Sequence, residues 1–367
     1  MINLRLKAEF KEKGVPFVAR LQTKIDQFED ADPEKVVIYK DEVGYLDCES
    51  SFGPFKIFKD QQDDFLGDLI IVHPNLNKIQ RLFRANSKNN TFLFTERCDQ
   101  LCAMCSQPPR EIDDTWRHPL YYQAIELLPK DTFIFISGGE PTLYKESLFN
   151  ILSHAAEIRP DIRFQILSNG QHFEEEDVDR LREIHEKLDV TWGVPLYSSQ
   201  PEEHELIVGK KGSFNPLMKN LFLLASSGAK IELRTVVTKV NVLGLAELGM
   251  FISDHIPFIS CWAIMAMEPI GFAKANKEGL YYDHSIAPQP IHNALDVAKI
   301  RGIFTRLFNF PTCTIGEEYH DYTVQSISDW KNKYIEECDS CSKKDTCCGF
   351  FEWYTDEWKW ENVRALR

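Results

Sequence analysis

The stretch "NTFLFTERCDQLCAMCSQPP", residues 90–109, joins a short apolar run to three closely spaced cysteines. The apolar run has the β-branched and aromatic content of a buried strand. Cys98, Cys102 and Cys105 then fall within eight residues, in the segment that follows the run. This pattern predicts a thiol-rich loop at the carboxyl end of a strand.

Five further apolar runs follow this stretch. They are "TFIFIS" (132–137), "RFQILSN" (163–169), "DVTWGVPLY" (189–197), "KIELRTVV" (230–237) and "ISCWAIMAM" (259–267). Helix-like segments lie between them, for example residues 174–188 and 213–228, and the second ends at a glycine that can cap a helix. Six strands that alternate with helices predict an α/β fold over residues 91–285, with a parallel sheet that is open or curled toward a barrel. In such folds ligands bind at the carboxyl ends of the strands.

The two flanking regions have other patterns. Residues 1–90 contain short apolar runs such as "KVVIYK" (35–40) and "DLIIVHP" (68–74) between turn residues, which predicts a small β-rich domain. This domain could dock a peptide or cover the open edge of the sheet. Residues 286–367 are more irregular, and a helix-like segment at 327–337 leads into a cysteine-rich tail.

Composition narrows the class of protein. The 367 residues carry a net charge of −14, which argues against a general nucleic-acid binder. The N-terminus has no apolar signal core, and no run reaches the ~18 apolar residues of a membrane span. We therefore expect a cytoplasmic protein, in which the ten cysteines serve metal binding or catalysis and not disulfides. Cys48 and Cys261 stand alone and are expected to be inert, buried side chains.

Three thiols in one loop limit the metal chemistry. A structural zinc site normally has four protein ligands, and this loop supplies three. A [4Fe–4S] cluster held by three thiolates leaves one iron open to a small molecule. Zinc held by three thiolates and a water is the alternative on chemistry alone.

The spacing Cys98-x3-Cys102-x2-Cys105 resembles the signature of the radical S-adenosylmethionine (SAM) superfamily. A second segment, "FIFISGGEPTL" (133–143), resembles the GGEP motif that holds the SAM amino group in that superfamily. The resemblance implies a partial (β/α)6 barrel, a [4Fe–4S] cluster with one open iron, and SAM as the second cofactor. One electron from the cluster would cleave SAM to methionine and a 5′-deoxyadenosyl radical, which takes a hydrogen atom from the substrate.

The same resemblance implies a set of SAM-binding residues. They are Met104, Gly138, Gly139, Glu140, Pro141, Ser168, Asn169, Ser198 and Arg234. Relatives often place an arginine soon after the position of Ser198, whereas the stretch "EEHELIVGKKGSF" (202–214) has none. Three alternatives remain open: Lys210 substitutes, Arg234 substitutes, or neither does.

The tail "CDSCSKKDTCCGFF" (338–351) predicts a second metal site. Cys338, Cys341 and Cys347, with Cys313 as the fourth thiol, could hold zinc or an iron–sulfur cluster. Many peptide-modifying radical SAM enzymes carry an auxiliary cluster in a similar tail, so the resemblance favours iron–sulfur. Cys348 is adjacent to Cys347 and is therefore awkward as a further ligand.

Several segments together look like the His-Xaa-Ser system radical SAM maturases of the HxsC type. They are "TERCDQLCAMCSQPPR" (95–110), "VPLYS" (194–198), "MEPIGFAKAN" (267–276) and the tail from residue 326. Cys348 and Asp99 depart from the glycine and asparagine expected there. The resemblance implies a peptide or small-protein substrate, a partner protein of the same gene system, and a flavodoxin or ferredoxin as electron donor; it implies neither nucleic acid nor membrane.

Two other functions remain open from the sequence. One is a radical SAM enzyme that acts on a small molecule or nucleotide, although the cysteine-rich tail argues against it. The other is a non-enzymatic iron–sulfur or zinc scaffold, which a degenerate GGEP segment or a missing cluster cysteine would favour; the sequence has neither.

Overall fold

The N-terminal part of the chain forms a closed barrel of seven strands. The computed structural model describes residues 4–23, 35–50, 53–60 and 64–367. The barrel strands are β1 (Arg5–Phe10), β2 (Phe17–Thr23), β3 (Lys35–Glu42), β4 (Tyr45–Ser50), β5 (Gly53–Phe58), β6 (Leu69–His73) and β7 (Lys78–Phe83). They pair in the order β1-β5-β4-β3-β2-β6-β7, and β1 returns to β7, which closes the sheet. The β-rich character predicted for this region is confirmed.

Alternating side chains fill this barrel, and one charged pair lies within its packing. In β1, Leu6 and Ala8 are buried while the residues beside them are exposed, as the period of a strand requires. Arg81 Nε donates to Asp68 Oδ2 at 2.7 Å, and both side chains are at most 3% exposed. Asp68 Oδ1 also accepts from the backbone N–H of Ala85 at 2.8 Å. The pair therefore fastens β7 to the turn before β6.

A second sheet of seven strands follows, and all of its pairs are parallel. In spatial order its strands are β8 (Asn90–Thr95), β9 (Phe133–Gly138), β10 (Arg163–Leu167), β11 (Asp189–Pro195), β12 (Lys230–Val237), β13 (Cys261–Ala266) and β14 (Thr305–Phe308). The sheet is an open arc, a partial barrel whose edges are β8 and β14. In β9, β12 and β14 buried residues alternate with residues that are only partly buried, so one face of these strands is covered more completely than the other.

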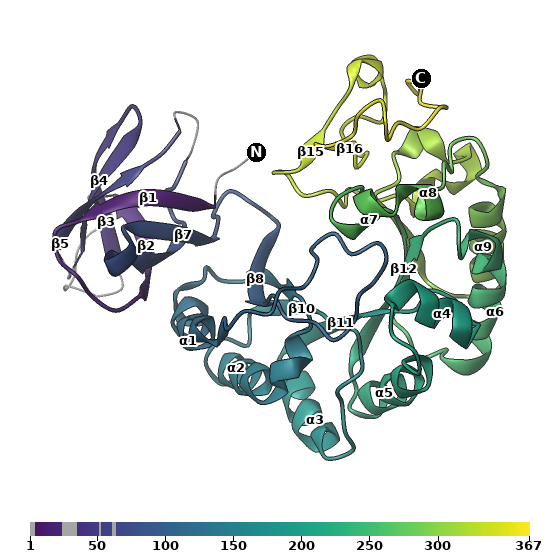
Figure 1. The fold of residues 1–367 in the computed structure, drawn as a ribbon, viewed down its shortest axis with the longest axis horizontal. Coiled ribbons are helices and arrows are strands. Elements are labelled where there is room, and N and C mark those ends of the chain that lie inside the picture. Colours follow the sequence, from purple (N-terminus) through teal and green to yellow (C-terminus); the bar gives the residue numbers. More distant parts are fainter. Residues whose placement is uncertain (1–3, 24–34, 51–52, 61–63) are drawn as a thin grey trace.

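Six helices lie along the outer side of this arc (Figure 1): α1 (His118–Leu127), α2 (Lys145–Ile158), α3 (Asp177–Lys187), α5 (Phe214–Ser226), α6 (Leu245–His255) and α9 (Gln289–Arg301). Three shorter helices, α4 (Pro201–Val208), α7 (Phe272–Ala275) and α8 (Lys277–Leu280), pack beside the cysteine loop. Apolar faces of the longer helices pack on the strands in one continuous core. The helix predicted within 213–228 ends as expected, because Gly228 takes the left-handed conformation (φ 77°) just after α5.

All six predicted strands of the sheet are present, and a seventh was not predicted. Strand β14 is only four residues long, "TRLF", and follows α9 beyond residue 285. Such a short run carries little periodic signal. It is a strand because it pairs with β13 over residues 305–308, a contact that local sequence does not encode.

The prediction of a helix at residues 327–337 is wrong. This segment contains turns, the short strand β15 (Asn332–Lys333) and the start of a 3-10 turn, η7 (Glu336–Cys338). Strand β15 pairs with β16 (Phe350–Phe351), which follows the last cysteines. Pairing with the tail thus overrides the helix-like spacing of apolar residues. The other 3-10 turns are η1 (Pro74–Leu76), η2 (Thr115–Arg117), η3 (Pro141–Tyr144), η4 (Val242–Gly244), η5 (Thr312–Thr314) and η6 (Glu317–Tyr322).

The N-terminal barrel and the cysteine-rich tail flank the sheet on different sides (Figure 1). The backbone N–H of Val18 in β2 donates to Gln123 Oε1 in α1 at 3.1 Å, which joins the N-terminal barrel to the first helix. Within the described residues, no helix is both long and apolar enough to cross a bilayer.

Asp68→Ala should destabilise the N-terminal barrel by about 3–5 kcal/mol, because it leaves the Arg81 guanidinium buried without its carboxylate. Urea unfolding of the full chain, with hydrogen exchange read in residues 64–84, measures the loss. Glu42→Ala is the control, since it removes an exposed pair with Lys40 and should leave the unfolding midpoint unchanged. Equal midpoints for the two variants would contradict the role given to the buried pair.

Candidate functional site

A cavity of about 490 Å³ lies at the carboxyl ends of the parallel strands. This volume is within the usual range for small-molecule sites. The structure brings most of the predicted site residues to its wall: Cys98, Cys102, Met104, Cys105, Gly138, Gly139, Glu140, Ser168, Asn169 and Arg234. Pro141 and Ser198 are buried and do not line it.

Backbone hydrogen bonds hold the loop that carries the three cysteines. On one side, the carbonyl of Arg97 accepts from the backbone N–H of Glu140 at 2.7 Å. On another, the carbonyl of Cys105 accepts from Phe272 N–H at 2.8 Å, and Ala103 N–H donates to the carbonyl of Ile207 at 2.8 Å. Elements far apart in sequence therefore fix the loop.

Two glycines make these contacts possible. A Cβ on Gly139 would lie 2.0 Å from the carbonyl oxygen of Arg97, and one on Gly271 would lie 2.4 Å from that of Cys105. Gly271 also has a φ of 60°, which disfavours other residues. The glycines of the "GGE" turn and of "PIGF" thus let neighbouring backbone approach the cysteine loop.

The three cysteines of this loop are unpaired and partly exposed to the cavity. Burial raises the pKa of Cys98 and of Cys102 to about 12, and it also raises the pKa of Cys105. These thiols are protonated at neutral pH, and a bound metal would displace their protons. Three soft donors that face one cavity fit an iron–sulfur cluster with one iron left open.

Glu140 mainly holds the strand ends together. Its carboxylate is 1% exposed, and its Oε1 accepts from Thr142 N at 2.8 Å, Thr142 Oγ1 at 2.5 Å and Ser168 Oγ at 2.8 Å. Its Oε2 accepts from Asn169 N at 2.5 Å. Burial raises the pKa of Glu140, whereas these donors favour its ionised form. Glu140 thereby links the end of β9 to the end of β10.

Asp99 connects the cysteine loop to Asn169. Its Oδ1 accepts from Asn169 Nδ2 at 2.7 Å, and its Oδ2 pairs with Lys210 Nζ and lies 3.3 Å from His172 Nε2. Burial alone would raise the pKa of Asp99, but the hydrogen bonds from His172 and Lys210 outweigh it and lower that pKa. Lys210 is therefore engaged by Asp99 and does not line the cavity.

The other residues predicted to bind SAM fall into two groups, those that line the cavity and those that do not. Arg234 lines the cavity and pairs with Glu232, which also accepts from Gln165 Nε2 at 2.7 Å. Met104 is buried, and it lies in an apolar cluster with Tyr197. Ser198 instead accepts from the backbone N–H of Gln200 at 3.0 Å, just before α4.

Sequence reasoning missed the far wall of the cavity. Glu268, Asn309, Ser326, Ser328 and Lys331 line it, and Lys331 Nζ lies 3.0 Å from both carboxylate oxygens of Glu268. These residues come from the loop after β13, the end of β14 and the segment after it. Glu268 lies in "MEPIGFAKAN", and Ser326, Ser328 and Lys331 lie in the tail from residue 326, but the resemblance assigned none of them to the cavity. A correct prediction of β14 would have been a further signal, since Asn309 follows that strand directly.

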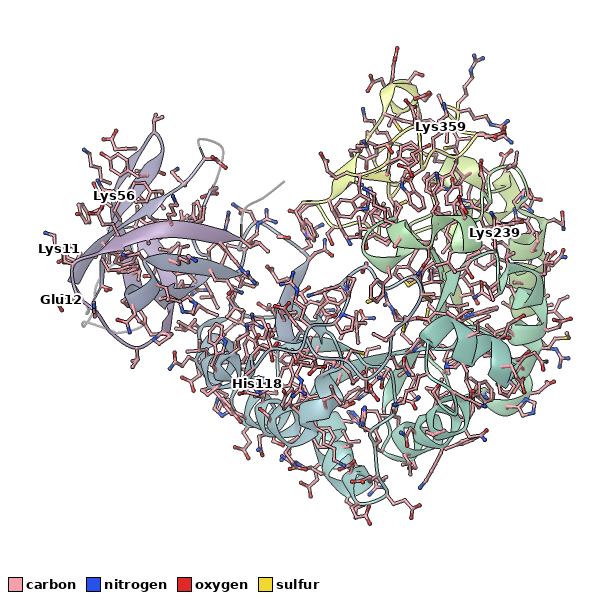
Figure 2. The ribbon with its side chains drawn as sticks, viewed as in Figure 1. Lys11, Glu12, Lys56, His118, Lys239 and Lys359 are labelled. Carbon is pink, nitrogen blue, oxygen red and sulfur yellow. The ribbon has the colours of Figure 1, made fainter. Side chains whose placement is uncertain are left out.

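His118 illustrates a histidine with a structural role (Figure 2). Its ring stacks on Phe94 with centroids 4.2 Å apart, and its Nε2 lies 3.1 Å from the carbonyl oxygen of Phe94. Its Nδ1 lies 2.9 Å from Ser147 Oγ. Both ring nitrogens are used in packing α1 and α2 on β8.

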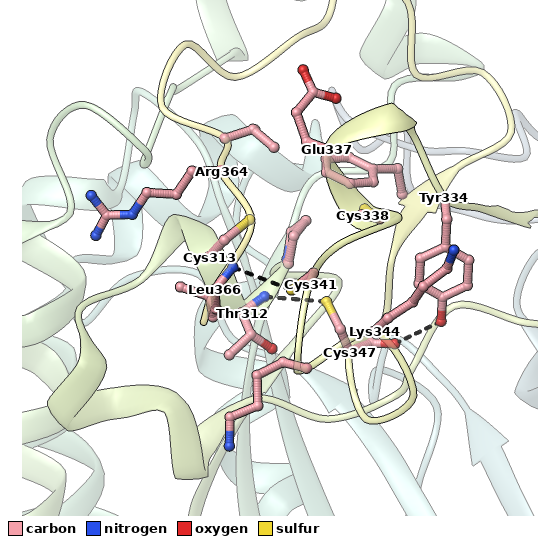
Figure 3. Close-up of a pocket in the computed structure, with 14 residues that line it drawn as sticks. Thr312, Cys313, Tyr334, Glu337, Cys338, Cys341, Lys344, Cys347, Arg364 and Leu366 are labelled. Carbon is pink, nitrogen blue, oxygen red and sulfur yellow. Dashed lines mark hydrogen bonds between the residues drawn. The ribbon is translucent and has the colours of Figure 1, made fainter.

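The four predicted cysteines of the second site meet around one small pocket (Figure 3). Cys313 comes from the turn after β14, and Cys338, Cys341 and Cys347 come from the tail. The enclosed space is about 20 Å³, room for about one water molecule. A cubane cluster would need the surrounding loops to move outward.

Backbone donors point at two sulfurs of this pocket. Cys347 Sγ accepts from Thr312 N and from Gly349 N, both at 3.4 Å, and Cys341 Sγ accepts from Leu366 N at 3.4 Å. A hydrogen bond from the Cys348 thiol, with help from these backbone donors, lowers the pKa of Cys347 to about 5. N–H donors to thiolate sulfur are a common second layer around metal centres.

Cys348 lies outside this pocket. It is 2% exposed and packs with Ile327 and Phe351, and burial raises its pKa well above the ordinary value. The cysteine that departs from the expected glycine is therefore part of a small apolar core.

Neither cysteine group converges on a common point. Among the described residues, no three His, Cys, Asp or Glu side chains are placed as ligands of one metal ion. In a [4Fe–4S] cluster each thiolate binds a different iron, so the ligands surround a space and need not share a point.

The central part of the chain matches a known protein family. Residues 92–246 match the model of the Radical SAM superfamily. Among curated proteins, none matches the chain.

Several solved structures resemble the chain distantly. SuiB of Streptococcus suis, solved with S-adenosylmethionine, is 19% identical with a TM-score of 0.47, and the match covers 59% of this chain and 49% of SuiB. The protein anSMEcpe, solved with AdoMet, is 14% identical with a TM-score of 0.41, and coverage is 59% and 60%. A radical SAM methyltransferase from Sphaerobacter thermophilus is 12% identical with a TM-score of 0.44, and coverage is 72% and 73%.

The chain thus spans about half the length of the SuiB chain that it matches. The superfamily implies a [4Fe–4S] cluster and SAM, and the thiols and glycines of the cavity fit both. The match to the Radical SAM superfamily model over residues 92–246 thus falls on the part of the chain that forms most of the partial barrel and carries the cysteine loop after its first strand.

Proposed function

We propose that this protein is a radical SAM enzyme that modifies a peptide or small protein, as a maturase of the His-Xaa-Ser type. One observation carries the radical SAM part. Cys98, Cys102 and Cys105 line the same cavity as the "GGE" turn and the polar ends of β10. When bound, the reduced cluster supplies one electron that cleaves SAM to methionine and a 5′-deoxyadenosyl radical, which abstracts a hydrogen atom from the substrate.

The chain's own residues would bind and orient these groups. The three thiols would hold the cluster, and the open backbone at Gly138 and Gly139 would let the methionyl part of SAM approach closely. Glu140 and Asp99 would fix Asn169 at the cavity wall. Arg234 is the remaining cation near the predicted SAM side, and it would pair with the SAM carboxylate.

We propose that Cys313, Cys338, Cys341 and Cys347 hold the second metal centre. Their common pocket and the backbone donors to Cys341 and Cys347 support a bound metal. The resemblance to peptide maturases favours an iron–sulfur cluster, with zinc as the alternative.

The peptide substrate rests on the resemblance to the His-Xaa-Ser maturases. One SuiB structure was solved with the precursor peptide SuiA bound, and one anSMEcpe structure was solved with AdoMet and a Cp18Cys peptide. A small-molecule or nucleotide substrate is the alternative. The proposed partners are a flavodoxin or ferredoxin that supplies the electron and a protein of the same gene system, in the cytoplasm.

Cys102→Ala should abolish SAM cleavage, because two thiolates of this loop cannot hold the cluster. Anaerobic assays with SAM and dithionite, read as 5′-deoxyadenosine by mass spectrometry, should give a loss of about 100-fold or more. Cys261→Ala is the matched control, since Cys261 lines neither cysteine site. Equal product from wild type and Cys102→Ala would contradict the proposed ligand.

Gly139→Ala should weaken SAM binding by about tenfold or more, because its Cβ would push the Arg97 carbonyl and shift the cysteine loop. Titration of the iron-loaded protein with SAM measures the dissociation constant. Gly279→Ala in α8 is the control, because a Cβ there meets no atom within 4 Å. If both variants bound SAM with the wild-type dissociation constant, the close approach at Gly139 would not matter for the site.

Cys341→Ala should remove the second metal and leave the first. For two iron–sulfur clusters the iron content would fall by about half, whereas for zinc the loss would appear in zinc alone. Elemental analysis of the reconstituted proteins gives the answer, with Cys261→Ala as a control that keeps both metals. Unchanged iron and zinc in Cys341→Ala would exclude that thiol as a ligand.

A further inference from the structure

The open side of the partial barrel is crossed by residues 323–331, here called the strap. The sheet leaves β8 and β14 as edges that do not pair with each other. The strap begins beside β14, where Thr323 forms a parallel bridge with Leu307 and Val324 N–H donates to the carbonyl of Leu307 at 3.2 Å.

The strap then turns past the end of β14. Asn309 N–H donates to Ser326 Oγ at 2.6 Å, and Ser326 Oγ donates to Asn309 Oδ1 at 3.0 Å. Asn309 has a φ of 65°, a conformation that asparagine tolerates better than most residues. These paired bonds set the direction in which the strap leaves the sheet.

Near its other end, the strap is tied to the segment that leads into β8. Asp329 Oδ1 accepts from Ser87 Oγ at 2.9 Å, and Asp329 Oδ2 lies 3.2 Å from Arg84 Nη2. Asn89 and Thr91 beside this contact line the cavity. The strap therefore spans the gap from the end of β14 to the start of β8.

Successive strap residues point to opposite sides. Ser326 and Ser328 line the cavity, whereas Ile327 between them packs with Cys348 and Phe351 of the tail. An extended segment alternates in this way. One side of the strap thus forms the wall of the cavity, and the other side rests on the cysteine-rich tail.

Lys331, at the end of the strap, contacts both the loop after β13 and the segment after β16. Its Nζ contacts both carboxylate oxygens of Glu268 at 3.0 Å, and the two side chains are 19% and 17% exposed. Its carbonyl accepts from Glu352 N–H at 2.8 Å, directly after β16. Asn332 beside it donates to the carbonyl of Cys348, and Tyr334 OH donates to that of Cys347 at 3.1 Å.

We propose that Lys331 is a positioning residue. It fixes the strap as the wall of the cavity between β14 and β8, and it connects that wall to the second cysteine site. The cluster and SAM would fill the half of the cavity that contains the three thiols and the "GGE" turn. The half lined by Met265, Phe308, Ser326 and Ser328 remains for the substrate, and its shape depends on where the strap lies. The tail would thereby affect the reaction, because it holds the strap and so fixes the shape of the substrate half of the cavity.

Hydrogen exchange of the strap tests this role without any substrate. In the metal-loaded protein, Lys331→Met should speed exchange of the amides in residues 323–331 by about tenfold or more. Lys359→Met is the control, because Lys359 is 58% exposed and pairs with Asp356, which is outside the strap. The urea midpoint and the content of both metals should be the same in the two variants.

Rescue separates the ion pair from simple loss of packing. Lys331→Arg should keep the slow exchange, since a guanidinium can bind both oxygens of Glu268. Glu268→Gln should speed exchange less than Lys331→Met does, because its amide oxygen still accepts one bond. Wild-type exchange in residues 323–331 of Lys331→Met would overturn the proposal.

The link to the second site has its own variant, and this arm rests on the proposed metal there. Cys347→Ser should lose that metal and speed exchange in residues 323–331 to a similar extent. Loss of the metal with wild-type exchange would overturn the link to the tail. None of these readouts requires SAM cleavage, so failure of the proposed chemistry is seen separately in the 5′-deoxyadenosine assay.

Discussion

The close approach of backbone to the cysteine loop is the constraint on which the site depends. The loop between β8 and α1 has little regular structure of its own, yet it must present three thiols to one cavity. The turn after β9 reaches the Arg97 carbonyl only because Gly139 has no Cβ, and the segment before α7 reaches the Cys105 carbonyl through Gly271. The strands end beside the cysteine loop, and the two glycines let the backbone that follows those strands approach the loop closely.

Charged side chains in and around the cavity have hydrogen-bond or ion-pair partners. Glu140 accepts four hydrogen bonds, Asp99 holds Lys210 and His172, and Arg234 is matched by Glu232. A charged group in such a place is costly unless a partner or a bound ligand compensates it. Glu140 also joins the ends of β9 and β10, and Asp99 joins the cysteine loop to His172 and Lys210, whereas Arg234 and Glu232 both lie in β12. The three thiols of the cysteine loop belong to none of these pairs.

Much of the fold was predictable because its signals are local. Short apolar runs indicated the first six strands of the sheet, and the spacing of Cys98, Cys102 and Cys105 indicated a site at the end of the first. The grouping of Cys313 with Cys338, Cys341 and Cys347 also followed from composition and was found in one pocket. Strand β14, the turns at 327–337 and the Lys331–Glu268 pair were not predicted. Each depends on a partner distant in sequence: β13, β16 and the loop after β13.

The central claim is that three thiolates leave one iron open for SAM. Pulsed electron–nuclear double resonance on the dithionite-reduced, iron-loaded protein with SAM labelled with ¹⁵N in its amino group tests this directly. A hyperfine coupling from that nitrogen is expected, since direct coordination brings the amino group to the open iron. A fully reduced cluster that shows no coupling to labelled SAM, at a concentration that saturates binding, would contradict it.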